Sequence, residues 1–191
     1  MAPKTPPPVL EVPRGWRSKE AASFVAQLDW LSEARFAGMR GISVAELQWQ
    51  PRPGANTIGM LFVHCAIHEV GWMLIAKGRL ADERFTEVLG LDRDATGIPL
   101  PPRGRATARL RGRSLAWYRR VHEKARRFVT RTAKTLTPAD LSRVIEASPR
   151  RDGVRVPVNA RWILFHLVKH EAGHLGQMLM LRHEYRDRRR R

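Results

Sequence analysis

Three histidines stand four residues apart inside an otherwise apolar stretch of the chain, residues 159–181, at positions His166, His170 and His174. At about 100° per residue, they fall within an arc of roughly 80° on one face of a helix. A neutral imidazole is a common metal ligand, and histidines spaced i, i+4 on a helix can present two ring nitrogens to one ion. The spacing therefore predicts a metal-binding helix.

A second apolar stretch, residues 56–78, repeats the arrangement with His64 and His68, so that five of the seven histidines lie on the inner faces of two predicted helices. If the two helices are neighbours, His64 can meet the other histidines at a polyhistidine metal site. Three imidazoles leave at least one coordination position open, which is typical of a catalytic site and not of a sealed structural one. Zinc, nickel, cobalt and iron(II) are all compatible with such ligands.

Four long helical segments must position these histidines. Capping residues and apolar spacing predict them at about 19–39 after Ser18, about 57–77 before Gly78, about 106–134, and from Asn159 onward. Loops of very different length join them, which indicates an all-α fold, a four-helix bundle with at least one crossover connection. Bundle cores are natural places for metal sites because side chains of facing helices converge there.

The links between the long helices have weaker signals. Ser43 and Glu46 are spaced as a capping box, and Thr137 begins a short capped helix that extends to about residue 147. Residues 81–104 and 148–158 are predicted to be loops or short irregular pieces, and no β-sheet is expected.

Length and composition indicate one domain in a reducing compartment. A chain of 191 residues with 43% hydrophobic content can form one sizeable core, which we place at 17–185 after a Pro-rich disordered arm, 1–16. Cys65 is the only cysteine, so neither an intrachain disulfide nor a thiolate zinc cage can form, and a cytoplasmic location is expected. His, Lys or Glu interrupt the apolar runs, so we expect no transmembrane helix, and the N-terminus does not resemble a signal peptide.

The net charge is +17, and part of it lies in a basic tail, residues 186–191. Such a surface attracts nucleic acid or anionic membrane electrostatically. However, arginine is scattered through predicted helices and loops alike, with no recognition helix, RNP-type motif or zinc finger. Specific nucleic-acid binding and membrane binding are therefore not expected.

The two histidine-bearing segments, IGMLFVHCAIHEVGW and RWILFHLVKHEAGHLGQ, resemble those of the DinB-like/YfiT-like superfamily of metal-binding four-helix bundles, which includes mycothiol- and bacillithiol-dependent transferases. One family motif, L-x-x-H followed by an aromatic residue eight positions later, is matched by Leu61, His64 and Trp72. The other, similar to H-x-x-x-H-x-G-Q, is matched by His170, His174, Gly176 and Gln177. The resemblance covers roughly residues 18–185. It implies that His64, His170 and His174 are the metal ligands.

The resemblance gives His68 and His166 no ligand role. Each lies one turn from an implied ligand, so either could replace a ligand, line the pocket or carry a proton. The alternative is a core histidine hydrogen-bonded to a backbone carbonyl or a carboxylate. Glu69 and Glu171 directly follow a histidine and point elsewhere, which favours support of the ligands or a salt bridge over ligation.

Several further residues could contribute to the site. Gln177 lies on the ligand face and could bind water or substrate, or only pack, and Trp72 could wall the pocket or belong to the core. Cys65 is rotated about 100° from the ligand direction, which favours a buried, inert thiol. Arg35 could reach the site, but a side chain that extends to the surface is favoured, and both His122 and His183 are predicted to be exposed.

Three functions are compatible with this site. By resemblance, a His₃-bound divalent ion would hold a low-molecular-weight thiol, lower its pKa and so make it attack an electrophilic small-molecule substrate, giving a thiol S-transferase. The same ion could ionise water and give a metal-dependent hydrolase of amide or similar bonds. The third function is a non-catalytic, metal-binding stress protein. Bundles of this kind often pair through helices, so a homodimer is also expected.

Overall fold

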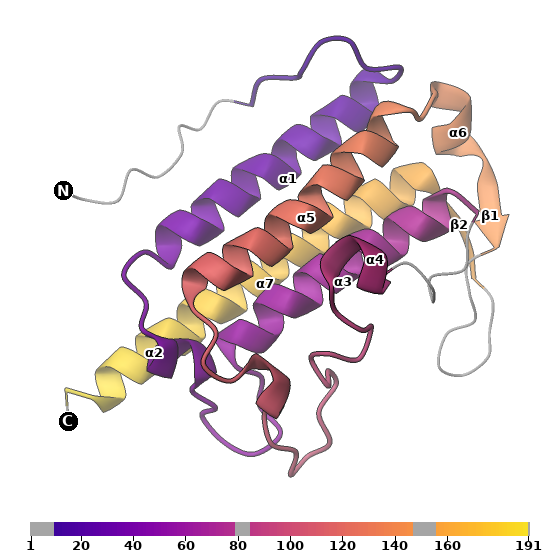
Figure 1. Ribbon diagram of the computed structural model, residues 1–191. Coiled ribbons are helices and arrows are strands. Elements are labelled where there is room, and N and C mark those ends of the chain that lie inside the picture. The colour runs from indigo at the N-terminus through magenta and orange to yellow at the C-terminus, as the bar shows by residue number, and fades with distance from the viewer. Residues whose placement is uncertain (1–9, 79–84, 147–155, 191) are drawn as a thin grey trace.

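The computed structural model describes residues 10–78, 85–146 and 156–190, and it is dominated by long helices (Figure 1). The four long helices are α1 (Lys19–Gly38), α3 (Ile58–Ala76), α5 (Leu115–Lys134) and α7 (Ala160–Arg188). The shorter elements are α2 (Val44–Gln48), α4 (Phe85–Leu89), the 3₁₀ helix η1 (Ala108–Leu110), α6 (Pro138–Ser142), β1 (Val144–Glu146) and β2 (Pro157–Asn159).

Each long helix begins at a polar side chain that caps its first turn. The side-chain oxygens of Ser18, Thr57, Ser114 and Asn159 accept hydrogen bonds from the backbone N–H groups three residues later. A cap of this kind satisfies one of the four N–H groups that have no partner within the helix. Local sequence therefore determines where these helices start, and the expected starts of α1, α3 and α7 are confirmed to within one residue.

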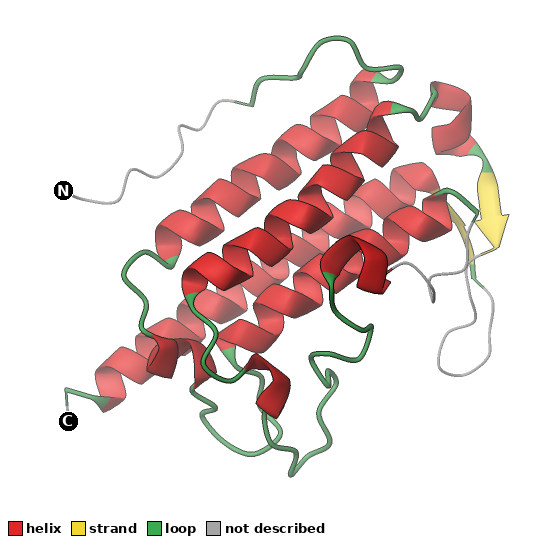
Figure 2. Cartoon of the chain, viewed as in Figure 1, coloured by secondary structure: helices red, strands yellow, loops and turns green. Residues whose placement is uncertain are grey.

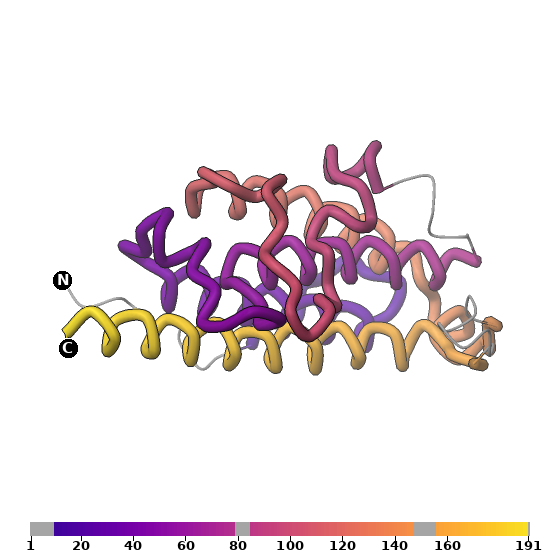
Figure 3. Tube along the Cα trace, turned by 90° about the horizontal axis from the view of Figure 1, so that it is seen from below, coloured from indigo at the N-terminus to yellow at the C-terminus, as the bar shows by residue number. Residues whose placement is uncertain are grey.

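The long helices form a bundle in which helix α7 packs against both α1 and α3, and α5 packs against α3 and α1 (Figures 1 and 3). Helices α3 and α5 run in the same direction, so the link between them, which includes α4, must return along the bundle. The predicted all-α four-helix bundle with a crossover connection is confirmed. Its topology brings the two histidine-bearing helices, α3 and α7, side by side and antiparallel.

Two expectations about the links are wrong. Helix α5 begins at Leu115 and not near 106, because Gly112 adopts a positive φ of 74° that breaks the helix after the short turn η1. A small antiparallel sheet is also present, in which β1 pairs with β2 and Ile145 lies opposite Val158 (Figure 2). Helix α6 accordingly ends at Ser142, and the chain that follows it enters β1.

The ends of the predicted domain are only partly described. Residues 1–9 of the expected N-terminal arm and 147–155 of an expected loop lie outside the described residues. Residues 10–16 of the arm contain no helix or strand, whereas residues 186–188 of the expected basic tail continue α7.

Helix α3 is the most apolar of the four. Among the described helices, it alone is long and apolar enough to meet the length and composition of a membrane span, and 72% of that stretch is buried inside the bundle. Its neighbours in the core come from three other helices, including Phe36 of α1, Tyr118 of α5 and Met178 of α7. Core packing therefore accounts for the apolar composition of α3.

Gly59 lets α3 approach α5 closely, and its replacement by alanine is expected to destabilise the protein. A Cβ atom at this position would clash with the hydroxyl of Tyr118 and would lie 2.8 Å from Cζ of that ring and 3.2 Å from the Leu47 carbonyl oxygen. Since Tyr118 is 1% exposed, the ring cannot move freely. We expect Gly59→Ala to lower the free energy of unfolding in urea by about 1–3 kcal/mol.

The matched control is Gly173→Ala, also within a long helix. No atom lies within 4 Å of a Cβ at Gly173, so alanine should instead stabilise α7 by about 0.5–1 kcal/mol through its higher helix propensity. Equal effects of the two substitutions would contradict the close contact at Gly59.

Candidate metal centre

Five histidines line the contact between α3 and α7, as the spacing predicts. His64 and His68 come from α3, and His166, His170 and His174 come from α7. Their rings alternate along the contact, with centroid distances of 5.0 Å from His64 to both His170 and His174, and 4.0 Å from His68 to His170. The cluster is partly buried, so its rings are held by packing and still lie near the surface of the bundle.

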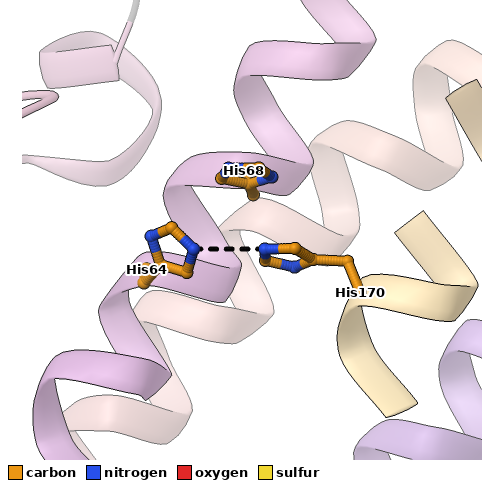
Figure 4. A group of neighbouring side chains, drawn as sticks. All are labelled: His64, His68 and His170. Carbon is orange, nitrogen blue, oxygen red and sulfur yellow. Dashed lines mark hydrogen bonds between the residues drawn. The ribbon is translucent and has the colours of Figure 1, made fainter. Parts of the chain in front are cut away.

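One ring nitrogen of His170 lies close to the same nitrogen of two other imidazoles. His170 Nε2 lies 3.1 Å from His64 Nε2 and 3.1 Å from His174 Nε2 (Figure 4 shows the first pair). Nitrogens bound to one tetrahedral ion at 2.0–2.1 Å are about 3.3 Å apart. The separations of both pairs therefore suit ligands of a single divalent metal ion.

Gln177 determines the tautomer of His174. Its side-chain oxygen lies 2.8 Å from His174 Nδ1, and because an amide oxygen can only accept, Nδ1 must carry the proton. The neutral ring then has a free lone pair on Nε2, which faces His170. A partner on the second ring nitrogen commonly orients a metal-bound histidine in this way.

Burial keeps the imidazoles of His64 and His170 unprotonated. Desolvation, with a smaller contribution from His174, lowers the pKa of His64 to about 4. Desolvation also holds the pKa of His170 well below its usual range, and the neighbouring His68 and His174 add to this shift. Since metals bind neutral imidazole, both side chains are ready to act as ligands at neutral pH.

His68 also belongs to the cluster, and nitrogens of His64, His68 and His170 lie within 4.8 Å of one another, so these three could hold a metal ion. However, the His68 and His170 rings are stacked with an angle of only 6° between their planes. An ion bound through an imidazole lone pair lies near the plane of the ring, and it cannot lie in two parallel planes at once. His68 therefore packs on His170 and cannot share an in-plane ion with it. The rings of His64 and His174 are inclined to that of His170 by 42° and 80°, so an ion can lie near the plane of each of them and of His170.

The far end of the cluster is aromatic. His166 stacks on Trp162 at 4.8 Å, and Trp72 contacts both rings edge-on. Both ring nitrogens of His166 and Nδ1 of His68 are buried without a hydrogen-bond partner among the described residues. The alternative of a core histidine bonded to a carbonyl or carboxylate is therefore wrong for His166. Trp72 packs on the site and on the core together.

Glu69 and Glu171 form buried ion pairs with arginines of the opposite helices, and an oxygen of Glu171 lies within 4.8 Å of a nitrogen of His170. Glu69 accepts two hydrogen bonds from Arg126 of α5, at 2.5 and 3.3 Å, and Glu171 lies 2.6 Å from Arg35 of α1. Because each glutamate directly follows one of the site histidines, these pairs hold the histidine-bearing turns of α3 and α7 to the opposite helices.

Two predictions about exposure are wrong, because Arg35 is 1% and His122 is 3% exposed. The Arg35 Nη2 atom lies 2.7 Å from His122 Nδ1 and 3.1 Å from Nε2. The Ser32 hydroxyl donates to the Leu28 carbonyl oxygen, so it can accept from His122 Nε2, which lies 2.8 Å away. Burial and the charge of Arg35 hold the pKa of His122 well below its usual value. The position of Arg35 on the apolar stripe of its helix was the available signal for its burial.

Cys65 lies on the inner side of the cluster. It is fully buried, and its Sγ lies within 4.8 Å of a nitrogen of His170 and an oxygen of Glu171. Desolvation, together with the nearby Glu171 charge, raises the pKa of the thiol well above its usual value. The expected burial of the thiol is confirmed, and the raised pKa favours its protonated form.

Comparison with known proteins supports the resemblance carried by the histidine motifs. No curated protein matches the chain. A model of the DinB superfamily matches residues 27–178, a range that begins inside α1 and includes all five histidines of the cluster. This range covers most of the chain, with the whole of α3 and α5 and the larger part of α1 and α7, and the chain therefore belongs to the DinB superfamily.

Proposed function

We propose that this protein is a divalent-metal-dependent S-transferase that activates a low-molecular-weight thiol at His64, His170 and His174. The observation that carries the proposal is the position of His170 Nε2, which lies 3.1 Å from Nε2 of both His64 and His174, with the His174 tautomer set by Gln177. Three neutral ligands leave the whole charge of a divalent ion to stabilise an anion, and a thiolate is the anion that such a centre favours near neutral pH.

The carboxylates beside the site support thiol transfer over hydrolysis. A metal-dependent hydrolase of the HExxH type uses a glutamate next to its ligands as general base. Here Glu69 and Glu171 each follow a site histidine, but both are held by buried arginines. A carboxylate paired with an arginine is a weaker base for water, even though an oxygen of Glu171 lies within 4.8 Å of a His170 nitrogen, whereas a thiol with a lowered pKa needs no such base.

The test uses untagged, cobalt-loaded protein, so that added histidines do not bind metal. We expect thiols such as glutathione and cysteine to produce a sulfur-to-cobalt charge-transfer band, and the loaded protein to speed their reaction with chlorodinitrobenzene or an epoxide about tenfold or more over metal-free protein. If the loaded protein hydrolysed model amides and no thiol produced the charge-transfer band, the proposal would be wrong and the protein would be a hydrolase. Metal binding with neither response would leave a non-catalytic binding protein.

A further inference from the structure

A cavity of about 220 Å³ lies between the start of α3 and the C-terminal half of α7. Its lining includes Asn56, Leu61, Gln177, Met180, Leu181 and Glu184. The two helices are antiparallel, so the N-terminal turns of α3 face the C-terminal turns of α7 (Figures 1 and 3). The cavity is therefore a product of the same helix contact that forms the histidine cluster.

The lining of the cavity comes within one helical turn of the histidines on both helices. Leu61 lies one turn before His64 on α3, and Gln177 lies one turn after His174 on α7. Gln177 belongs to both sites, because its oxygen accepts from His174 Nδ1 while its side chain lines the cavity. The amide NH₂ group of Gln177 thus remains for a ligand that lies in the cavity.

The lining combines apolar walls with one charge. Leu61, Met180 and Leu181 supply apolar surface, and Met180 is 65% exposed. Glu184 is the only charged residue of the lining, and it forms no ion pair among the described residues. On a protein of net charge +17, an unpaired carboxylate at the cavity favours a protonated amine over a carboxylate on the ligand.

The distance along α7 sets the length of the ligand. Ten residues separate His174 from Glu184, which corresponds to about 15 Å along a helix axis. A thiol of two or three carbons whose sulfur lies at the histidines cannot reach Glu184. A chain of about eight carbons, or a peptide-like or sugar-like skeleton of equal length, can reach it.

We propose that this cavity binds the thiol co-substrate, and that the thiol is an elongated molecule with sulfur at one end and a protonated amine at the other. Its sulfur lies at His64, His170 and His174, its skeleton lies along Leu61 and the apolar wall of α7, and its amine pairs with Glu184. The inference rests on the proposed function, because it assumes that the metal binds thiol sulfur.

The experiment measures how tightly cobalt-loaded protein binds alkanethiols that serve as a molecular ruler. Thiols with two or eight carbons are compared, each ending in an amine, a hydroxyl or a carboxylate, and the charge-transfer band gives each Kd. We expect the Kd of the eight-carbon aminothiol to be about fivefold lower than that of the eight-carbon hydroxythiol. The difference from the eight-carbon thiol acid should be larger still. The two-carbon series should show little dependence on the end group.

The Glu184→Gln variant should remove the preference for the long aminothiol while leaving the cobalt spectrum and the two-carbon series unchanged. Glu123→Gln, which changes an exposed glutamate on α5, is the matched control and should keep the preference. Long thiols that bind without regard to end group, or a preference that survives Glu184→Gln, would overturn the assignment of the cavity. If no thiol of either length produced the band, the proposed function would fail instead.

Discussion

The His170→Ala variant is expected to bind no divalent metal under conditions in which the wild-type protein binds about one ion per chain. His170 belongs to both candidate ligand sets, because it is grouped with His64 and His174 in one and with His64 and His68 in the other. Its Nε2 lies 3.1 Å from Nε2 of His64 and 3.1 Å from Nε2 of His174. Its removal leaves only two of the three proposed ligands and takes away the nitrogen that lies close to both of them. Elemental analysis of untagged protein after incubation with zinc and removal of free metal measures the difference.

The control is His183→Ala, because His183 is exposed on α7, outside the cluster. This variant should keep the wild-type metal content. A His170→Ala protein that retained a full equivalent of metal would show that the cluster is not the metal site.

Two further variants separate the candidate ligand sets. We expect His174→Ala to weaken metal binding by about 100-fold or more, because it removes a ligand whose Nε2 faces the site. His68→Ala should weaken it by less than about tenfold, because His68 only stacks on His170 at 4.0 Å. The reverse order, measured by competition with a chelator, would make His64, His68 and His170 the ligands and His174 a neighbour.

The second large effect is expected for Arg126→Met, which should lower the free energy of unfolding by about 3–5 kcal/mol at neutral pH. Arg126 is the partner of Glu69, which is fully buried, and it also reaches Asp29 of α1 at 2.8 Å. Methionine fills a similar volume but leaves the buried carboxylate of Glu69 without its cation. An uncompensated buried charge lowers the free energy of unfolding more than the loss of both partners would. Urea unfolding monitored by circular dichroism measures the loss.

The pH dependence of this loss follows from Glu69. Desolvation already raises the pKa of Glu69 above its ordinary 4.5, against the opposing charge of Arg126, and without Arg126 the pKa rises further. The folded variant then binds a proton that the unfolded chain releases, so its stability falls as pH rises. The deficit relative to wild type should be complete above the raised pKa and should shrink as pH falls toward 4.5.

The matched control is Arg161→Met, which breaks an exposed pair. Arg161 and Glu20 lie 2.6 Å apart but are 41% and 42% exposed, so water can replace the interaction. The loss there should be much smaller than that of Arg126→Met and should change little with pH. Comparable losses for the two arginines would mean that burial does not set the strength of these pairs.

Sequence by itself determined the features that are local to one helix. The caps Ser18, Thr57 and Asn159 bond to backbone groups three residues away, and the four-residue spacing of histidines is already one helix face. The histidine cluster and the bundle were therefore predictable before any helix was placed beside another. The start of α5 was not, because the apolar pattern continued through a glycine whose backbone conformation ends the turn.

Only the tertiary structure decided which groups face one another across helices. Arg35 and His122 are charged or polar in sequence, and their burial follows from a partner on α7 and from each other. The distinction between His68 and His174 depends on ring orientation, which arises when α3 packs on α7 and leaves one ring stacked and the other inclined. The identity of the partner of each buried charge has no local sequence signal, because the chain brings the two groups together only on folding.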